Sequence, residues 1–130
     1  MVVDSSMSDE KKFTALIVDD NIAVQNVEQM LLHKKGFETK VVASGQEAFN
    51  IFSEGKCFDV VFMEMKLPIM DGIQASKELQ AMGVKCLIFG MITSESKFDI
   101  QAFLEADLDG CIMKPLYFVK IDNALKSIEK

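Results

Sequence analysis

The stretch VVFMEMKLPIMDG, residues 60–72, begins as a continuous apolar run, meets an acid at Glu64 and leaves through a proline-containing loop. A short apolar run without polar alternation is typical of a strand that is covered on both faces. The residues that follow, GIQASKELQAM, have the spacing of a helix, with Asp71 as its expected cap. The stretch therefore predicts a buried strand, a loop and a helix, with an acid where the strand ends.

The same unit of strand and helix repeats along the chain. The four other apolar runs of strand length are FTALIVDD (13–20), TKVVA (39–43), KCLIFGM (85–91) and GCIM (110–113). The helices expected after the five strands are residues 22–35, 44–55, 72–82, 97–106 and 118–129. This alternation predicts an α/β fold in which five parallel strands form one doubly wound, flavodoxin-like sheet between two helical layers.

Two of these helices carry more detailed signals. The side of the first helix that is expected to face the sheet carries Ala23, Val27, Met30, Leu31 and Lys34. In the second helix, Ser44 and Glu47 have the spacing of a capping box, in which each side chain bonds the backbone beside the other. These patterns predict which helix surface is buried and where the second helix begins.

Length and composition limit the classes of protein. The 130 residues fit one domain, expected at residues 13–130 after a flexible polar tail, residues 1–12. A net charge of −6 argues against a nucleic-acid partner, and no apolar window is long enough for a membrane span. The three cysteines have no paired spacing, which predicts buried thiols and a reducing compartment, the cytoplasm or the nucleus.

The expected strand ends carry the residues of chemical interest. Asp19 and Asp20 end the first strand, Glu64 the third, Thr93 follows the fourth and Lys114 the fifth. In an open parallel sheet these ends converge on one edge. Clustered carboxylates repel one another unless they are protonated or neutralised by a hard cation such as Mg²⁺. Together with an ammonium and a hydroxyl, they predict a site that binds a phosphoryl group.

A simpler interpretation exists for each residue taken alone. Asp19 and Asp20 could only cap the following helix. Lys114 could be a surface lysine, and Thr93 an ordinary turn residue. The coincidence of all these residue types at strand ends favours the binding site over these alternatives.

The motifs LIVDD (16–20), MEMKLPIMDG (63–72) and CIMKPL (111–116) resemble, in order and spacing, the receiver domain of two-component response regulators. The resemblance covers residues 13–128, and the short form is similar to the small plant receivers, with FLEADLDGCIMKPL pointing to their C-type group. It implies that Mg²⁺ is held directly by Asp20 and the backbone carbonyl of Lys66, and through water by Asp19. Lys114 would contact the acyl phosphate and form a cis peptide bond with Pro115.

The resemblance also implies a partner. The phosphoryl donor would be a phosphohistidine on a histidine kinase or a histidine phosphotransfer protein. That partner would dock on the helix after Asp20, and the receiver itself would be a monomer or a weak dimer.

The sequence departs from the receiver pattern in three places. The acceptor position, normally aspartate, is Glu64, and an aromatic residue often found three positions before Lys114 is replaced by Cys111. Counting back from Lys114 places Ile92 at the usual hydroxyl position, whereas matching the dipeptide TS places Thr93 there.

Glutamate is longer than aspartate by one methylene, about 1.5 Å of bond. Because phosphoryl transfer depends on alignment, we expect Glu64 to be a poor acceptor that could partly imitate the phosphorylated state. The sequence therefore predicts a single-domain signalling receiver, defective in phosphorylation or phosphomimetic, that binds a phosphotransfer protein or kinase. The alternative is an Mg²⁺-dependent phosphohydrolase acting on phosphohistidine partners. A flavodoxin-like flavin or nucleotide binder is disfavoured, because the loops contain no glycine-rich phosphate cradle.

Overall fold

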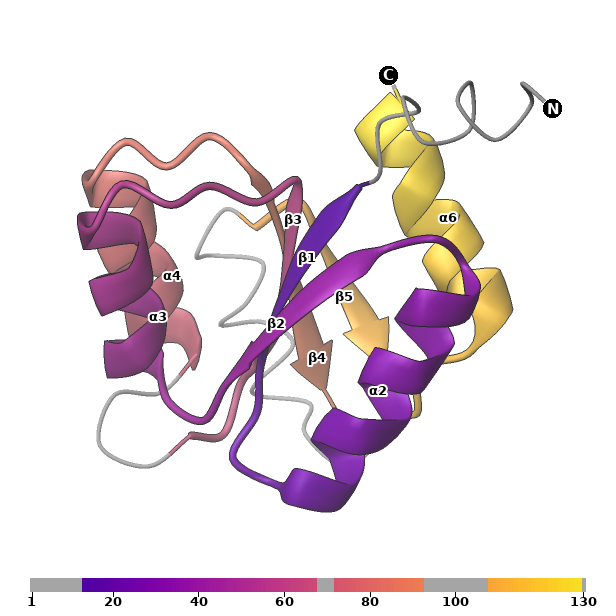
Figure 1. The fold of residues 1–130 in the computed structure, drawn as a ribbon. Coiled ribbons are helices and arrows are strands. Elements are labelled where there is room, and N and C mark those ends of the chain that lie inside the picture. Colours follow the sequence, from indigo (N-terminus) through magenta and orange to yellow (C-terminus); the bar gives the residue numbers. More distant parts are fainter. Residues whose placement is uncertain (1–12, 68–71, 93–107, 130) are drawn as a thin grey trace, which may run out of the picture.

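The computed structural model describes residues 13–67, 72–92 and 108–129, in which strands and helices alternate as predicted (Figure 1). The strands are β1 (Thr14–Val18), β2 (Glu38–Val42), β3 (Val60–Glu64), β4 (Leu87–Ile92) and β5 (Gly110–Met113). The helices are α2 (Ile22–Lys34), α3 (Gly45–Ser53), α4 (Gly72–Ala81) and α6 (Phe118–Glu129). The helix expected at residues 97–106 and the cap expected at Asp71 lie outside the described residues.

The five strands form one parallel sheet with the order β2-β1-β3-β4-β5. This order is that of the flavodoxin-like doubly wound sheet, so the fold prediction is confirmed. Val18 of β1 pairs with Met63 of β3, which brings the next residues of the two strands, Asp19 and Glu64, side by side at the carboxyl edge.

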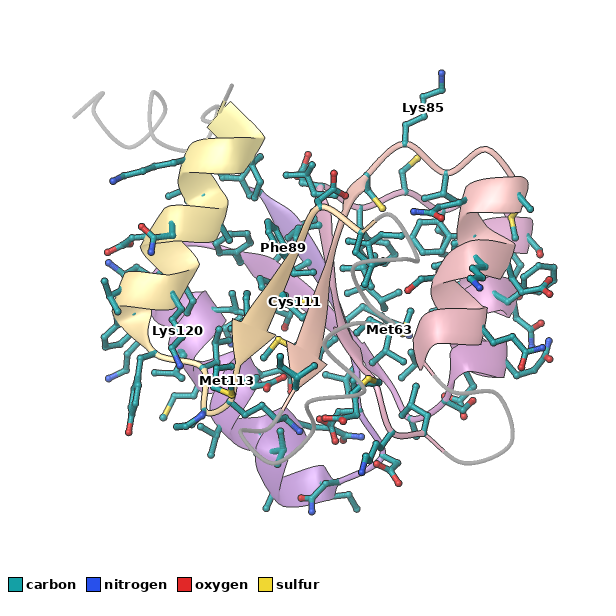
Figure 2. The ribbon with its side chains drawn as sticks, turned by 180° about the vertical axis from the view of Figure 1, so that it is seen from behind. Met63, Lys85, Phe89, Cys111, Met113 and Lys120 are labelled. Atoms are coloured by element: carbon teal, nitrogen blue, oxygen red, sulfur yellow. The ribbon has the colours of Figure 1, made fainter. Side chains whose placement is uncertain are left out.

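Helices cover both faces of the sheet. Figure 1 shows α2 and α6 on one side of the strands and α3 and α4 on the other. Phe62 and Phe89 stack 6.1 Å apart on the α2/α6 side, and Met63 belongs to the core on the α3/α4 side. Figure 2 shows Phe89 and Met63 on opposite sides of the sheet. Because successive strand residues point to opposite faces, residues with the parity of Phe62 and Glu64 face α2 and α6.

The helix ends follow from local sequence. Asn21 caps α2 by accepting a hydrogen bond from the amide of Val24 at 3.0 Å. Ser44 accepts one from the amide of Glu47 at 3.1 Å, and the Glu47 carboxylate accepts one from the amide of Ala43 at 3.0 Å. The predicted cap of α3 is therefore confirmed, with the return bond one residue before Ser44.

The predicted inner face of α2 is wrong. Val27 and Met30 are about half exposed, at 49% and 50%, whereas Glu28 and Leu32 are buried, at 3% and 0%. The helix is rotated relative to the prediction, so that Leu32 enters the core cluster on this side of the sheet and Glu28, one turn before it, is covered as well. A buried carboxylate is costly, which is why an acid was not expected in the core.

The cysteines depart from the prediction in part. Cys86 and Cys111 are half-buried, but Cys57 is exposed in the connection between α3 and β3. The thiol is exposed because this connection lies at the end of the sheet, beyond the apolar layers. In the part of the chain that the structure describes, no helix has the length and apolar character needed to cross a bilayer.

Candidate functional site

The carboxyl ends of β1 and β3 place two buried carboxylates next to each other. Asp19 follows the last residue of β1 and is 2% exposed, and Glu64 ends β3 and is 7% exposed. The parallel pairing of β1 with β3 sets these positions, and the apolar residues before each acid hold the strands in the core. The predicted convergence of these two acids is observed.

Lys114 supplies the positive charge between them. Its backbone amide donates to the carbonyl of Ile92 at 2.7 Å, which extends the β4–β5 ladder by one residue. Its ammonium donates to Asp19 Oδ2 at 3.1 Å and also to Glu64 Oε1. The Lys114–Pro115 peptide bond is cis, as the resemblance implied. An ammonium and two carboxylates from three strands thus form one ion-paired cluster.

The remaining carboxylate oxygens are held by backbone amides. Asp19 Oδ1 accepts a hydrogen bond from the amide of Asn21 at 2.9 Å, and Glu64 Oε2 accepts one from the amide of Lys66 at 3.0 Å. Each oxygen of Glu64 therefore has a donor, one neutral and one charged. The Lys66 side chain itself is exposed at the rim.

The electrostatics of Lys114 reflect this cluster. Burial by itself lowers the pKa of a lysine, but the hydrogen bond and negative charge of Glu64, with those of Asp19, outweigh it and raise the pKa of Lys114. Lys114 therefore remains an ammonium at neutral pH and offsets the charge of one of the two acids.

Glu28 is a third buried carboxyl group, which the sequence analysis missed. It projects from α2, and burial raises its pKa from 4.5 to about 7; the negative charges of Asp19 and Glu64 act in the same direction, against the attraction of Lys114. A signal did exist in the sequence, because Glu28 lies four residues from both Val24 and Leu32 on one helical stripe. At neutral pH this group is therefore poised between its neutral and charged forms.

The other predicted site residues lie at the margin of this cluster, away from it, or outside the residues that the structure describes. The Asp20 side chain is exposed beside the cluster, and Thr93 lies outside the described residues. Ile92 is described, and its side chain packs with Met65 on the face of the sheet opposite to Glu64. Counting back from Lys114 would place Ile92 at the hydroxyl position beside Glu64. The structure does not place it there.

The donor atoms fit a hard divalent cation by their chemistry. Carboxylate and carbonyl oxygens, from Asp19, Asp20, Glu64 and Lys66, are the ligands that Mg²⁺ takes. Within the described ranges, however, no three acidic, histidine or cysteine side chains form a ready metal site. The ammonium of Lys114 is bonded to both Asp19 and Glu64, two of the acids that such a site would use.

An apolar cavity of about 290 Å³ adjoins the cluster on the side of α2. Its walls are residues of the first turns of α2 and of the loop after β5: Ala23, Val24, Val27, Glu28, Lys114, Pro115 and Leu116. Glu28 and Lys114 are its charged members, so the cavity connects the outer surface of α2 with the ion-paired cluster.

Comparison with known proteins is consistent with this geometry. Two proteins of Arabidopsis thaliana are similar over most of both chains. Two-component response regulator 24 is 38% identical over 119 residues, which cover 92% of this chain and 86% of that protein. Two-component response regulator ARR22 is 31% identical over 114 residues, which cover 86% of this chain and 80% of that protein.

The fold comparison gives the same result. The receiver domain of sensor histidine kinase PA1611 from Pseudomonas aeruginosa, solved with a magnesium ion coordinated in its active-site cleft, superposes with a TM-score of 0.81 at 24% identity. The superposition covers 92% of this chain and 100% of that one, and it establishes a common fold. The family model for the response regulator receiver domain matches residues 15–126. The chain therefore belongs to the response regulator receiver domain family of two-component signalling.

Proposed function

We propose that this receiver takes up phosphoryl groups poorly at Glu64, imitates part of the phosphorylated state, and acts by binding a histidine phosphotransfer protein or a histidine kinase. The observation that carries the proposal is the ion-paired cluster of Glu64, Lys114 and Asp19. In this cluster the carboxylate at the acceptor position already holds the lysine that a receiver uses to contact the acyl phosphate.

The environment of Glu64 supports weak acceptor chemistry. Its two oxygens accept hydrogen bonds from Lys114 and from the amide of Lys66, so an attacking oxygen must first give up one of these donors. The extra methylene also moves the carboxylate relative to an aspartate by about 1.5 Å of bond. A displacement of about 1 Å can slow a transfer reaction on the order of 10²-fold.

The same contacts support imitation of the phosphorylated state. The Glu64 carboxylate holds Lys114 with a single negative charge and two oxygens, whereas a phosphoryl group carries about two charges and three oxygens. The imitation is therefore partial. The residue three positions before Lys114 is Cys111, so the aromatic rotamer change of many receivers has no counterpart at that position.

Mg²⁺ belongs to this proposal as a cofactor. Asp20, Asp19, Glu64 and the carbonyl of Lys66 would hold it, and it would supply the positive charge that neutralises a phosphoryl group. Because Lys114 shares Asp19 and Glu64 with the metal, we expect the ion to compete with Lys114 and to bind more weakly than in a receiver with a shorter acceptor residue.

The outer surface of α2 is the proposed docking surface. Ile22, Val27 and Met30 are large apolar side chains there, 71%, 49% and 50% exposed. Val27 also lines the apolar cavity beside Lys114, so a partner on this surface would approach the acceptor position. Exposed apolar side chains grouped beside a polar site are typical of a protein interface.

The decisive experiment compares Glu64→Asp with the unchanged chain. Both are incubated with acetyl phosphate and Mg²⁺, and the acyl phosphate is measured by intact mass. We expect labelling of Glu64→Asp to be faster on the order of 10²-fold, because the shorter side chain restores the alignment. Glu78→Asp, which shortens an exposed acid of α4, is the matched control and should label as slowly as the unchanged chain.

Two results would count against the proposal. Equal labelling of Glu64→Asp and the unchanged chain would remove the argument from alignment. If the unchanged chain instead released inorganic phosphate from a phosphohistidine partner with turnover, the alternative function, an Mg²⁺-dependent phosphohydrolase, would replace a role in binding alone.

A further inference from the structure

A second cavity, of about 650 Å³, lies at the end of the sheet opposite to Lys114. It is bordered by the connections that lead into β3 and β4, and both Cys57 and Cys86 line it. Figure 2 shows Lys85, the neighbour of Cys86, at one end of the molecule and Met113, the neighbour of Lys114, towards the other. These thiols have no part in the proposed phosphoryl chemistry.

The two cysteines occupy adjacent chain segments of similar shape. α3 and α4 lie side by side (Figure 1), and two residues after each helix end is a glycine with positive φ, +91° at Gly55 and +88° at Gly83. Glycine adopts this backbone conformation without strain, so both chains turn back toward the sheet in the same way. The two connections therefore enter neighbouring strands from the same side.

The backbone ladder brings these segments together just before the strands begin. The amide of Leu87 donates to the carbonyl of Asp59 at 3.2 Å, and Leu87 pairs with Val60 in the parallel register. Cys86 directly precedes Leu87, and Cys57 lies two residues before Asp59. Because Val60 pairs with Leu87, Cys86 stands opposite Asp59, and Cys57 lies two residues further along its connection. A disulfide needs Cα atoms less than about 7 Å apart, so the bridge requires the exposed connection around Cys57 to move toward Cys86.

The two thiols differ in a way that suits sequential oxidation. Cys57 is exposed to solvent, and Cys86 is half-buried at the wall of the same cavity. Burial is the main cause that raises the pKa of Cys86 to about 11, and the negative charges of Asp109, Asp59 and Cys57 act in the same direction. An accessible thiol and a sheltered one thus share one cavity.

We propose that Cys57 and Cys86 are a redox-sensitive pair that hydrogen peroxide converts to an intramolecular disulfide. The Cys57 thiolate attacks the peroxide oxygen, the O–O bond breaks, and Cys57 becomes a sulfenic acid while hydroxide leaves and is protonated to water. The Cys86 thiolate then attacks the Cys57 sulfur, the S–S bond forms, and a second water leaves. Two thiols are oxidised and one peroxide is reduced to two waters.

The bridge would join the connection before β3 to the connection before β4. It would not involve Asp19, Glu64 or Lys114, so its presence does not depend on the proposed function. It would close a chain loop that includes β3 and α4, and closing a loop of this size raises the thermal unfolding temperature if the native geometry accepts it.

The test treats the purified, reduced full chain with hydrogen peroxide under non-reducing conditions. We expect the accessible thiols of the unfolded product, titrated with a thiol reagent, to fall from three to one. The intact monomer should lose two hydrogen atoms, and a proteolytic digest should contain one cross-linked peptide pair that joins Cys57 to Cys86. The rate should rise with pH, because more of the Cys86 thiol is ionised at higher pH.

Three variants provide the controls. Cys111→Ala, which alters the third thiol on β5, should still form the bridge, whereas Cys57→Ser and Cys86→Ala should not. Peptide mapping of the unchanged chain gives the result even where a variant folds poorly. The proposal is overturned if the cross-link includes Cys111, if only bridges between two chains form, or if Cys57 is oxidised to sulfinic acid while Cys86 stays reduced.

Discussion

The two ends of β3 each have a carboxylate, and the two carboxylates are stabilised differently. Asp59, just before the strand, accepts hydrogen bonds from the amide and the hydroxyl of Thr14 at 2.8 and 3.2 Å. Glu64, at the other end, accepts them from the ammonium of Lys114 and the amide of Lys66. The first acid has neutral partners from the adjacent strand, and the second depends on a charge 50 residues away.

This difference separates a structural end of the sheet from the end where we propose the function. Neutral donors from a neighbouring strand are present whenever the sheet is formed, and Asp109 repeats the arrangement by accepting the amide of Ile88 at 2.7 Å. A lysine shared between Asp19 and Glu64 can instead be displaced by a cation or attracted by a phosphoryl group. A carboxylate thus fixes the fold at one edge and can respond to ligands at the other.

The largest effect on stability is expected for Lys114→Met. Removal of the ammonium leaves Asp19, Glu64 and Glu28 close together without a cation. Breaking a buried ion pair in this way costs about 3 kcal/mol or more. Urea unfolding at pH 7.5 measures the loss. Lys35→Met is the control, because Lys35 pairs with Asp122 at the surface at 2.9 Å and should lose less than about 1 kcal/mol. Equal losses of unfolding free energy in the two variants would mean that the cluster of Asp19, Glu64 and Lys114 stabilises the fold no more than a surface ion pair does.

Next in size is the pH-dependent effect of Glu28→Gln. Because the pKa of Glu28 is raised from 4.5 to about 7, the folded state holds the proton more tightly than the unfolded state does. The contribution of Glu28 to stability is therefore complete below pH 4.5 and is lost as the pH rises to about 7.

Replacement of Glu28 by glutamine removes this dependence. The variant should match the unchanged chain near pH 4.5 and exceed it by up to about 3 kcal/mol at pH 8, as measured by urea unfolding across this range. Glu78→Gln, at an exposed position of α4, should give a pH-independent difference. Parallel pH profiles for Glu28→Gln and the unchanged chain would show that Glu28 is ionised in both states.

A smaller loss of unfolding free energy is expected at the other end of β3, where Asp59 lies. Asp59→Ala leaves the amide and hydroxyl of Thr14 without their acceptor, which should cost about 2 kcal/mol. Asp59→Asn keeps an acceptor oxygen and should lose less. Binding of Mg²⁺, followed by calorimetry, should be unchanged in both variants, because Asp59 lies at the opposite end of β3 from the cluster. Weaker Mg²⁺ binding in either variant would contradict the separation of the two edges.

The smallest effect in free energy concerns docking. Ile22→Asp places a charge on the exposed apolar surface of α2 and should weaken binding of a histidine phosphotransfer domain about tenfold, or about 1.4 kcal/mol. Unfolding free energy should change little, because Ile22 is 71% exposed. Gln46→Glu adds the same charge on α3, across the sheet, and should leave affinity unchanged. If Gln46→Glu weakens binding as much, the partner does not discriminate between the two helical layers.

Much of the fold was predictable because its signals are local. Continuous apolar runs predicted the five strands, and Ser44 with Glu47 predicted the start of α3, since a cap depends on residues only three apart. The rotation of α2 was not predictable in this way. An apolar pattern assigns Val27 and Met30 inward, whereas the observed rotation buries Glu28 beside residues that are distant in sequence.

Part of the candidate site could also be predicted. The acids at the ends of β1 and β3 and the lysine after β5 followed from strand positions and from the family motifs, and the structure brings Asp19, Glu64 and Lys114 into contact. Glu28 was missed because an acid is not expected in the core, and only the packing of α2 on the sheet shows that it is covered. The position of Ile92 was open because a one-residue change of register reverses the face of a strand, and the pairing of β4 with β3 decides it.

The sequence alone determined the alternation of strands and helices, the family and the glutamate at the end of the third strand, because each depends on residue type or on spacing within a short segment. The tertiary structure decided that Glu64 holds Lys114, that Glu28 lies buried with a raised pKa, and that Cys57 and Cys86 share a cavity. These features depend on distances between segments far apart in the chain, which only the packed sheet and its register define.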